Sequence, residues 1–73
     1  GINMLSPNAG KQGFLYDSSS NTIHDLSNET EACKIISLNK SACQICDSEK
    51  QVDDIALSNT LTKAIRCPYC FQK

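Results

Sequence analysis

Two Cys-x2-Cys pairs constrain the fold of this chain more than any other feature of its sequence. The first pair is C-Q-I-C, residues 43–46, the second is C-P-Y-C, residues 67–70, and twenty residues separate them. This spacing is typical of a zinc site with four thiolate ligands. Each pair can form a tight turn that presents two sulfurs, and two turns fill the tetrahedral shell of one Zn²⁺. We therefore predict one structural zinc ion, bound by Cys43, Cys46, Cys67 and Cys70.

The four cysteines also have two plainer interpretations, which are reduced thiols in a core or a pair of disulfides. A zinc ion with four protein ligands has no open position for water or substrate. No catalytic constellation surrounds a serine, cysteine or histidine elsewhere in the sequence. We therefore expect a structural metal and no enzymatic activity.

The length of the chain makes a stabilising metal plausible on physical grounds. It has 73 residues, 40% of them hydrophobic, with no tryptophan and four other aromatic residues. A core of this size contributes little stability by itself. Structural zinc in small domains contributes roughly 10–16 kcal/mol of apparent binding free energy, which is also folding free energy. Zinc binding would therefore supply the folding free energy that the core lacks.

A fifth cysteine and a single histidine leave a second possibility open. Cys33 could replace one of the four ligands, or begin a second site with His24. Such a second site would need nearby carboxylates, for which the sequence offers Asp25, Glu29 and Glu31. Otherwise Cys33 is a small buried residue and His24 is a surface or half-buried strand residue.

The first half of the sequence predicts a lead-in and a hairpin. Residues 1–12 are polar and contain Pro7 and Gly10, which favours a flexible lead-in, and residues 13–73 are expected to form a single zinc-binding domain. The polar run at 17–21 is typical of a turn between two short strands, so we predict a β-hairpin over 13–26. Residues 27–40 contain both a helix-capping pattern and the β-branched run K-I-I-S-L, and we expect a strand that leads into the first metal turn.

The second half, residues 41–73, is predicted as the four-cysteine zinc module. Ser48 and Gln51 have the spacing of a capping box, and apolar residues recur after them with a helical period. The polar run at 58–60 could end this helix, so residues 58–66 remain open between helix and strand. The fold class expected is a small zinc-stabilised α+β domain.

The cysteine pattern resembles known families over residues 43–70 only. It is similar to four-cysteine zinc ribbons and zinc knuckles, which implies a zinc-ribbon-like C-terminal half. RING-type ubiquitin ligases also begin with Cys-x2-Cys and end with Cys-Pro-x-Cys, but no Cys or His lies between Cys46 and Cys67, so a ligase would need a degenerate, single-zinc RING. C-P-Y-C is also similar to the glutaredoxin active site, although only three residues follow Cys70. The ending I-R-C-P-Y-C resembles small phage zinc-finger regulators that bind RNA.

Charge and cysteine usage narrow the functional expectation. The formal net charge of −1 becomes about −3 with four thiolates and one zinc ion, which does not favour phosphate binding. We expect a protein-interaction module, a fragment of a larger protein or assembly, that holds its partner through the hairpin and the apolar face of residues 48–66. The alternative is a nucleic-acid-binding ribbon that uses Lys63, Arg66 and Lys73. An odd number of cysteines and no apolar segment of membrane-spanning length indicate an intracellular protein, in cytoplasm or nucleus, without a membrane role.

Overall fold

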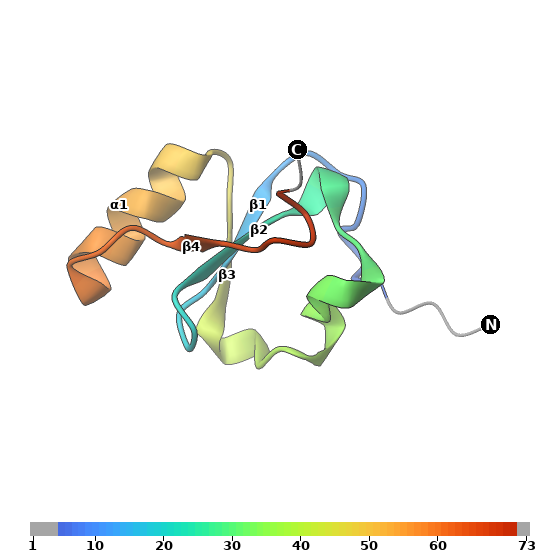
Figure 1. The fold of residues 1–73 in the computed structure, drawn as a ribbon, viewed down its shortest axis with the longest axis horizontal. Coiled ribbons are helices and arrows are strands. Elements are labelled where there is room, and N and C mark those ends of the chain that lie inside the picture. Colours follow the sequence, from blue (N-terminus) through green and yellow to red (C-terminus); the bar gives the residue numbers. More distant parts are fainter. Residues whose placement is uncertain (1–4, 72–73) are drawn as a thin grey trace.

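The computed structural model describes residues 5–71, and a four-stranded sheet lies at their centre (Figure 1). The strands are β1 (Phe14–Asp17), β2 (Thr22–Asp25), β3 (Cys43–Cys46) and β4 (Ile65–Arg66), in the order β3-β1-β2-β4. β1 pairs antiparallel with both β2 and β3, whereas β4 runs parallel to β2. The hairpin therefore supplies the two central strands of the sheet.

The turn between β1 and β2 is held by the carboxylate of Asp17. This carboxylate accepts hydrogen bonds from the N–H and hydroxyl of Ser19 and from the hydroxyl of Ser20. Asn21 has a φ of 52°, a left-handed conformation that asparagine tolerates better than most residues. Burial raises the pKa of Asp17, but these hydrogen bonds outweigh burial and hold the pKa below its ordinary value. The polar run thus forms the turn that its composition predicts.

One face of the sheet is covered by α1 (Glu49–Thr60). The helix begins where the capping pattern predicts, because the Ser48 hydroxyl accepts the N–H of Gln51 and the Gln51 side chain accepts the N–H of Asp47. It ends at Thr60, and the capping residue Leu61 that follows has a φ of 67°. The core between α1 and the sheet, here called the α1-side core, consists of Tyr16, Ile23, Cys46, Val52, Ala56 and Ala64.

The opposite face of the sheet is covered by residues 26–42, which we call the arm (Figure 1). The core between the arm and the sheet, here called the arm-side core, consists of Leu15, Leu26, Cys33, Ile35, Cys67 and Cys70. The arm consists of four single 3-10 turns, η1 (Leu26–Asn28), η2 (Glu31–Cys33), η3 (Ile35–Ser37) and η4 (Lys40–Ala42). The strand expected over K-I-I-S-L is wrong. Ile35 and Leu38 both pack against the arm-side core, and this spacing of three fits a 3-10 turn, whereas a strand buries alternate residues.

Residues 61–66 return the chain from α1 to the sheet. The sequence left helix and strand both open for residues 58–66. The structure contains both there, since α1 continues to Thr60 and β4 occupies Ile65–Arg66. Arg66 forms a two-pronged ion pair with Asp53 of α1, with N–O distances of 2.9 Å, and Asp53 also accepts the N–H of Ala64. These contacts hold β4 against the helix. The residues that follow include Cys67 and Cys70, which lie in the arm-side core.

Residues 5–12 contact the arm. The N–H and hydroxyl of Ser6 both donate to the Glu29 carboxylate, and the Gly10 N–H donates to the Leu26 carbonyl. The remainder of the predicted lead-in, residues 1–4, lies outside the described residues. No helix in residues 5–71 is long and apolar enough to cross a bilayer.

Candidate metal centre

Four buried side chains from distant parts of the sequence meet where the arm packs against the sheet. They are His24, Cys33, Cys67 and Cys70, and their ligand atoms all lie within 4.8 Å of one another. Within residues 5–71 this is the group of histidine, cysteine and acidic side chains whose geometry could hold a metal ion. Two of its members come from the second Cys-x2-Cys pair.

The elements of the fold place each of these residues. β2 directs His24 to the arm face, since its cross-strand partner Leu15 packs in the arm-side core. η2 ends at Cys33. Beyond β4, the Cys67 N–H donates to the Ile23 carbonyl, which continues the parallel pairing. The Cys67 carbonyl then accepts the N–H of Cys70, so the C-P-Y-C segment forms the tight turn that its sequence predicts.

The distances within the group suit a tetrahedral ion. The Sγ atoms of Cys33 and Cys67 are 3.6 Å apart, and the Cys70 Sγ lies 4.0 Å from the His24 Nδ1. Bonds of about 2.3 Å from zinc to sulfur and about 2.0 Å to nitrogen place tetrahedral ligand atoms about 3.5–3.8 Å apart. The two distances lie within about 0.5 Å of these values, and the group as a whole, whose ligand atoms lie within 4.8 Å of one another, would need to contract by up to about 1 Å around one ion.

Neighbouring polar groups orient two of the sulfurs. The backbone N–H of Asp25 donates to the Cys70 Sγ at 3.1 Å, and the Thr30 hydroxyl lies 3.6 Å from the Cys33 Sγ. Hydrogen bonds of this kind fix metal-bound thiolates and moderate their negative charge. The carboxylates of Asp25 and Glu29 are occupied elsewhere, by Ser27 and by Ser6. These two of the three carboxylates considered for a second site therefore hold the surrounding loops.

Burial shifts the pKa values of the group in a consistent way. Burial raises the pKa of Cys70 far above its ordinary value, and the thiols of Cys67 and Cys33 raise it further, although the Asp25 N–H opposes this. Burial lowers the pKa of His24, with the charges of Asp17 and Glu29 acting in the opposite direction. A neutral imidazole is the form that binds metals, and a metal ion can displace the protons of the thiols.

The other two predicted ligands, Cys43 and Cys46, lie in β3. Their backbone pairs with β1, so the segment forms part of the sheet and not a metal turn. Residues three apart in a strand point to opposite faces. Cys46 accordingly packs in the α1-side core, whereas Cys43 contacts the arm-side core. The structure thus brings Cys67 and Cys70 together with His24 and Cys33, and it does not bring Cys43 and Cys46 to them.

The sequence contained one sign of this arrangement. C-Q-I-C has the apolar and β-branched composition of a short strand as well as that of a metal turn. A strand at 43–46 would have removed both cysteines from the ligand set and left Cys33 and His24 to complete it. The prediction from sequence included those two residues only as a replacement ligand or a second site.

Comparisons with protein-family models, curated proteins and solved structures give no match. The resemblance to zinc ribbons, knuckles and RING domains therefore has no family match to support it. Metal binding is supported by the four side chains and their geometry.

Proposed function

We propose that this chain is a small domain that folds around one structural zinc ion and presents a surface to a protein partner. The observation that carries the proposal is the buried group of His24, Cys33, Cys67 and Cys70, with ligand atoms within 4.8 Å. Three thiolates and one imidazole are donors that zinc prefers, and this combination is common among structural zinc sites.

The zinc ion would join three segments that the sheet alone does not hold together. The hairpin contributes His24, the arm contributes Cys33, and the turn after β4 contributes Cys67 and Cys70. Four protein ligands complete the coordination shell, so the role proposed is structural and not catalytic. Folding free energy would then depend on metal binding.

Native mass spectrometry of variants tests the ligand set. We expect one zinc ion per chain in the unaltered protein, loss of zinc in Cys33→Ser, and retention in Cys43→Ser. Cys43 is a matched control because it is also a cysteine beside the arm-side core. Zinc lost from Cys43→Ser but kept by Cys33→Ser would instead support the four-cysteine site, and a metal-free folded chain would refute both.

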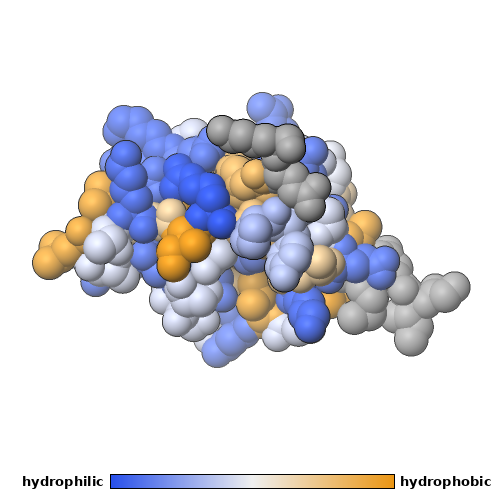
Figure 2. All heavy atoms as spheres, in the orientation of Figure 1, coloured by the Kyte–Doolittle hydropathy of each residue, from blue (hydrophilic) through white to orange (hydrophobic). Residues whose placement is uncertain are grey.

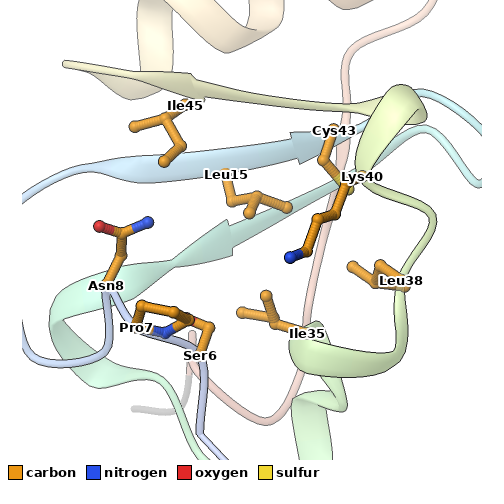
Figure 3. A pocket seen from close by; sticks show the side chains of 9 residues that line it. All are labelled: Ser6, Pro7, Asn8, Leu15, Ile35, Leu38, Lys40, Cys43 and Ile45. Atoms are coloured by element: carbon orange, nitrogen blue, oxygen red, sulfur yellow. The ribbon is translucent and has the colours of Figure 1, made fainter.

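The partner surface proposed is a cavity of about 310 Å³ between the arm and β3 (Figure 3). Its walls are largely apolar and include Leu15, Ile35, Leu38 and Ile45, and the Lys40 side chain extends over it. Lys40 has no ion pair within the described residues. A protein segment with an apolar side chain next to a carboxylate would match both features.

The edge of the sheet favours an extended partner segment. β3 is the outermost strand on its side, so within residues 5–71 no strand pairs with its outer edge. Ile45 on this strand is 53% exposed. An added strand could pair with the backbone of β3 while its side chains enter the cavity. By contrast, Val52 and Ala56 on the apolar face of α1 are fully buried and cannot serve a partner.

Charge-reversal variants test this surface once a candidate partner is in hand. We expect Lys40→Glu to weaken the complex at least tenfold in a calorimetric titration and Lys50→Glu to leave it unchanged. Lys50 is a matched control on α1, on the other side of the sheet. Equal effects of the two variants would show that the cavity is not the binding surface.

The nucleic-acid alternative has less support from the positions of its residues. Arg66 already pairs with Asp53 and Glu49, and Lys73 lies outside the described residues. Figure 2 shows hydrophilic side chains between separate apolar patches on the face in view. An oligonucleotide affinity that falls steeply as salt rises would nonetheless support this alternative.

A further inference from the structure

We propose that Cys33 and Cys67 form an oxidation site, at which a peroxide joins the two sulfurs in a disulfide and the bound metal ion is released. The release of metal rests on the proposed zinc site. The disulfide itself requires only the positions of the two thiols.

The two sulfurs are close enough for a small movement to join them. Their Sγ atoms are 3.6 Å apart in the structure, and a disulfide bond measures about 2.05 Å. Cys33 lies at the end of a single 3-10 turn, and Lys34 follows it with a φ of 55°. Because Cys33 belongs to the arm and not to the sheet, its side chain can shift without breaking strand pairing.

Cys70 is held more firmly than Cys33. Its sulfur accepts the Asp25 N–H and lies beside His24. Cys33 is 8% exposed, whereas Cys67 and Cys70 are each 4% exposed. A small oxidant entering from solvent therefore reaches Cys33 most easily, and Cys67 is the sulfur nearest to it.

The reaction balances with a peroxide as the oxidant. The Cys33 thiolate attacks one peroxide oxygen, the O–O bond breaks, and Cys33 becomes a sulfenic acid as hydroxide leaves. The Cys67 thiolate then attacks the sulfenic sulfur, the S–S bond forms, and a second hydroxide leaves. With two protons, two thiolates and hydrogen peroxide give one disulfide and two waters. A metal ion held by the group would thereby lose two anionic ligands and would be released as a hydrated ion.

The remaining cysteines serve as internal controls. Cys43 and Cys46 are three residues apart in β3, so they point to opposite faces of the sheet, and neither belongs to the group of four. Burial raises the pKa of both thiols, which keeps them in the less reactive protonated form. We expect them to remain reduced while Cys33 and Cys67 react.

Tryptic mapping distinguishes the possible disulfides. Cleavage after lysine and arginine places Cys33 in peptide 12–34, Cys43 and Cys46 together in 41–50, and Cys67 and Cys70 together in 67–73. The zinc-loaded protein is treated with hydrogen peroxide, blocked with iodoacetamide and digested, while a chromogenic chelator measures released zinc. We expect peptide 12–34 joined to 67–73 with Cys70 alkylated, together with about one zinc released per chain, and recovery of zinc binding after dithiothreitol and added zinc.

The outcomes separate this inference from the zinc proposal. An internal Cys67–Cys70 disulfide, a disulfide within 41–50, or sulfinic acids alone would overturn the oxidation site even if zinc binds as proposed. A chain that binds no zinc yet forms the Cys33–Cys67 disulfide would refute the zinc site and leave the oxidation site standing. Cys43→Ser should behave as the unaltered chain does, whereas Cys33→Ser should yield no peptide joined to 12–34.

Discussion

Asp53 and Asp54 are adjacent on α1 and both form ion pairs, but they differ in burial. The Asp53 side chain is 13% exposed and accepts two N–H groups of Arg66 and one of Ala64. The Asp54 side chain is 61% exposed and contacts only the Lys50 ammonium, at 3.0 Å. Ion pairs with two hydrogen bonds and partial burial stabilise proteins more than exposed pairs do.

We therefore expect Asp53→Ala to lower the free energy of unfolding by about 1–2 kcal/mol, because it removes the bonds that fasten β4 to α1. Asp54→Ala is the matched control and should change it by less than about 0.5 kcal/mol. Urea denaturation of the zinc-loaded proteins measures both. Equal losses in the two variants would contradict the role given to Asp53.

The Asp53 contribution should also depend on pH. The hydrogen bond from Arg66 holds the pKa of Asp53 below its ordinary value, so the folded state favours the carboxylate. The stability it adds is fully present above a pH of about 4 and is lost as pH falls through the lower, folded pKa. The difference in unfolding free energy between the unaltered chain and Asp53→Asn should follow this course. A difference that grows toward acid would show the opposite sign of linkage.

At the scale of elements, α1 carries its own signals for where it begins and ends. Ser48 caps its first turn, since the Ser48 hydroxyl accepts the Gln51 N–H at 3.1 Å. Loss of such a cap costs about 1 kcal/mol. We expect Ser48→Ala to lower the unfolding free energy by about this amount, and Ser58→Ala, at an exposed position of the same helix, to change it by a few tenths at most. Chemical denaturation measures both variants, and equal changes in unfolding free energy for Ser48→Ala and Ser58→Ala would contradict the role of the cap.

The end of α1 offers a stabilising change. Leu61 has a φ of 67°, a left-handed conformation that strains a residue with a β-carbon and that glycine adopts without strain. Its side chain is 86% exposed and contributes little packing. We expect Leu61→Gly to raise the unfolding free energy by about 0.5–1 kcal/mol. Leu57→Gly, one turn earlier within the helix, should lower it by about 1 kcal/mol. Thermal melts that showed losses in both variants would contradict the left-handed cap.

Elements that depend on local hydrogen bonds could be predicted from the sequence, and elements that depend on distant pairing could not. The turn at 17–21 and the start of α1 depend on local hydrogen bonds from Asp17 and Ser48, so composition and spacing were sufficient. β3 depends on its pairing with β1, far earlier in the chain, and no local signal specifies that partner. The assignment of Cys43 and Cys46 as ligands followed from reading C-Q-I-C as a turn. The 3-10 turns of the arm were not predicted for a similar reason. They depend on the packing of Ile35 and Leu38 with residues distant in the sequence, which no local pattern specifies.

At the scale of the whole molecule, the proposed metal ion would stabilise the two cores to different extents. Cys33, Cys67 and Cys70 all belong to the arm-side core, whereas the α1-side core contains none of the four proposed ligands. Removal of the ion would leave three buried thiols in the arm-side core, where Leu26 and Ile35 of the arm would still pack against Leu15 of the sheet. The α1-side core keeps its packing of Tyr16 and Val52.

We expect chelation to raise amide exchange rates at least tenfold in the arm and in residues 67–71, with smaller changes in α1. Hydrogen exchange followed by mass spectrometry, with and without EDTA, measures this. The Cys33→Ser variant should show the fast pattern without chelator. Uniform acceleration across both cores would mean that zinc supports the whole domain equally.

The order of the four proposed ligands along the chain bears on biosynthesis. Cys33 and Cys67 are 34 residues apart, so a ribosome that adds roughly 5–20 residues per second needs about 2–7 s to make the second half of the ligand set after the first. During this interval the nascent polypeptide carries two of the four proposed ligands, His24 and Cys33, which are too few to complete a zinc shell. Binding of the proposed ion would therefore come late in synthesis, after the residues of the hairpin and α1 have already been made.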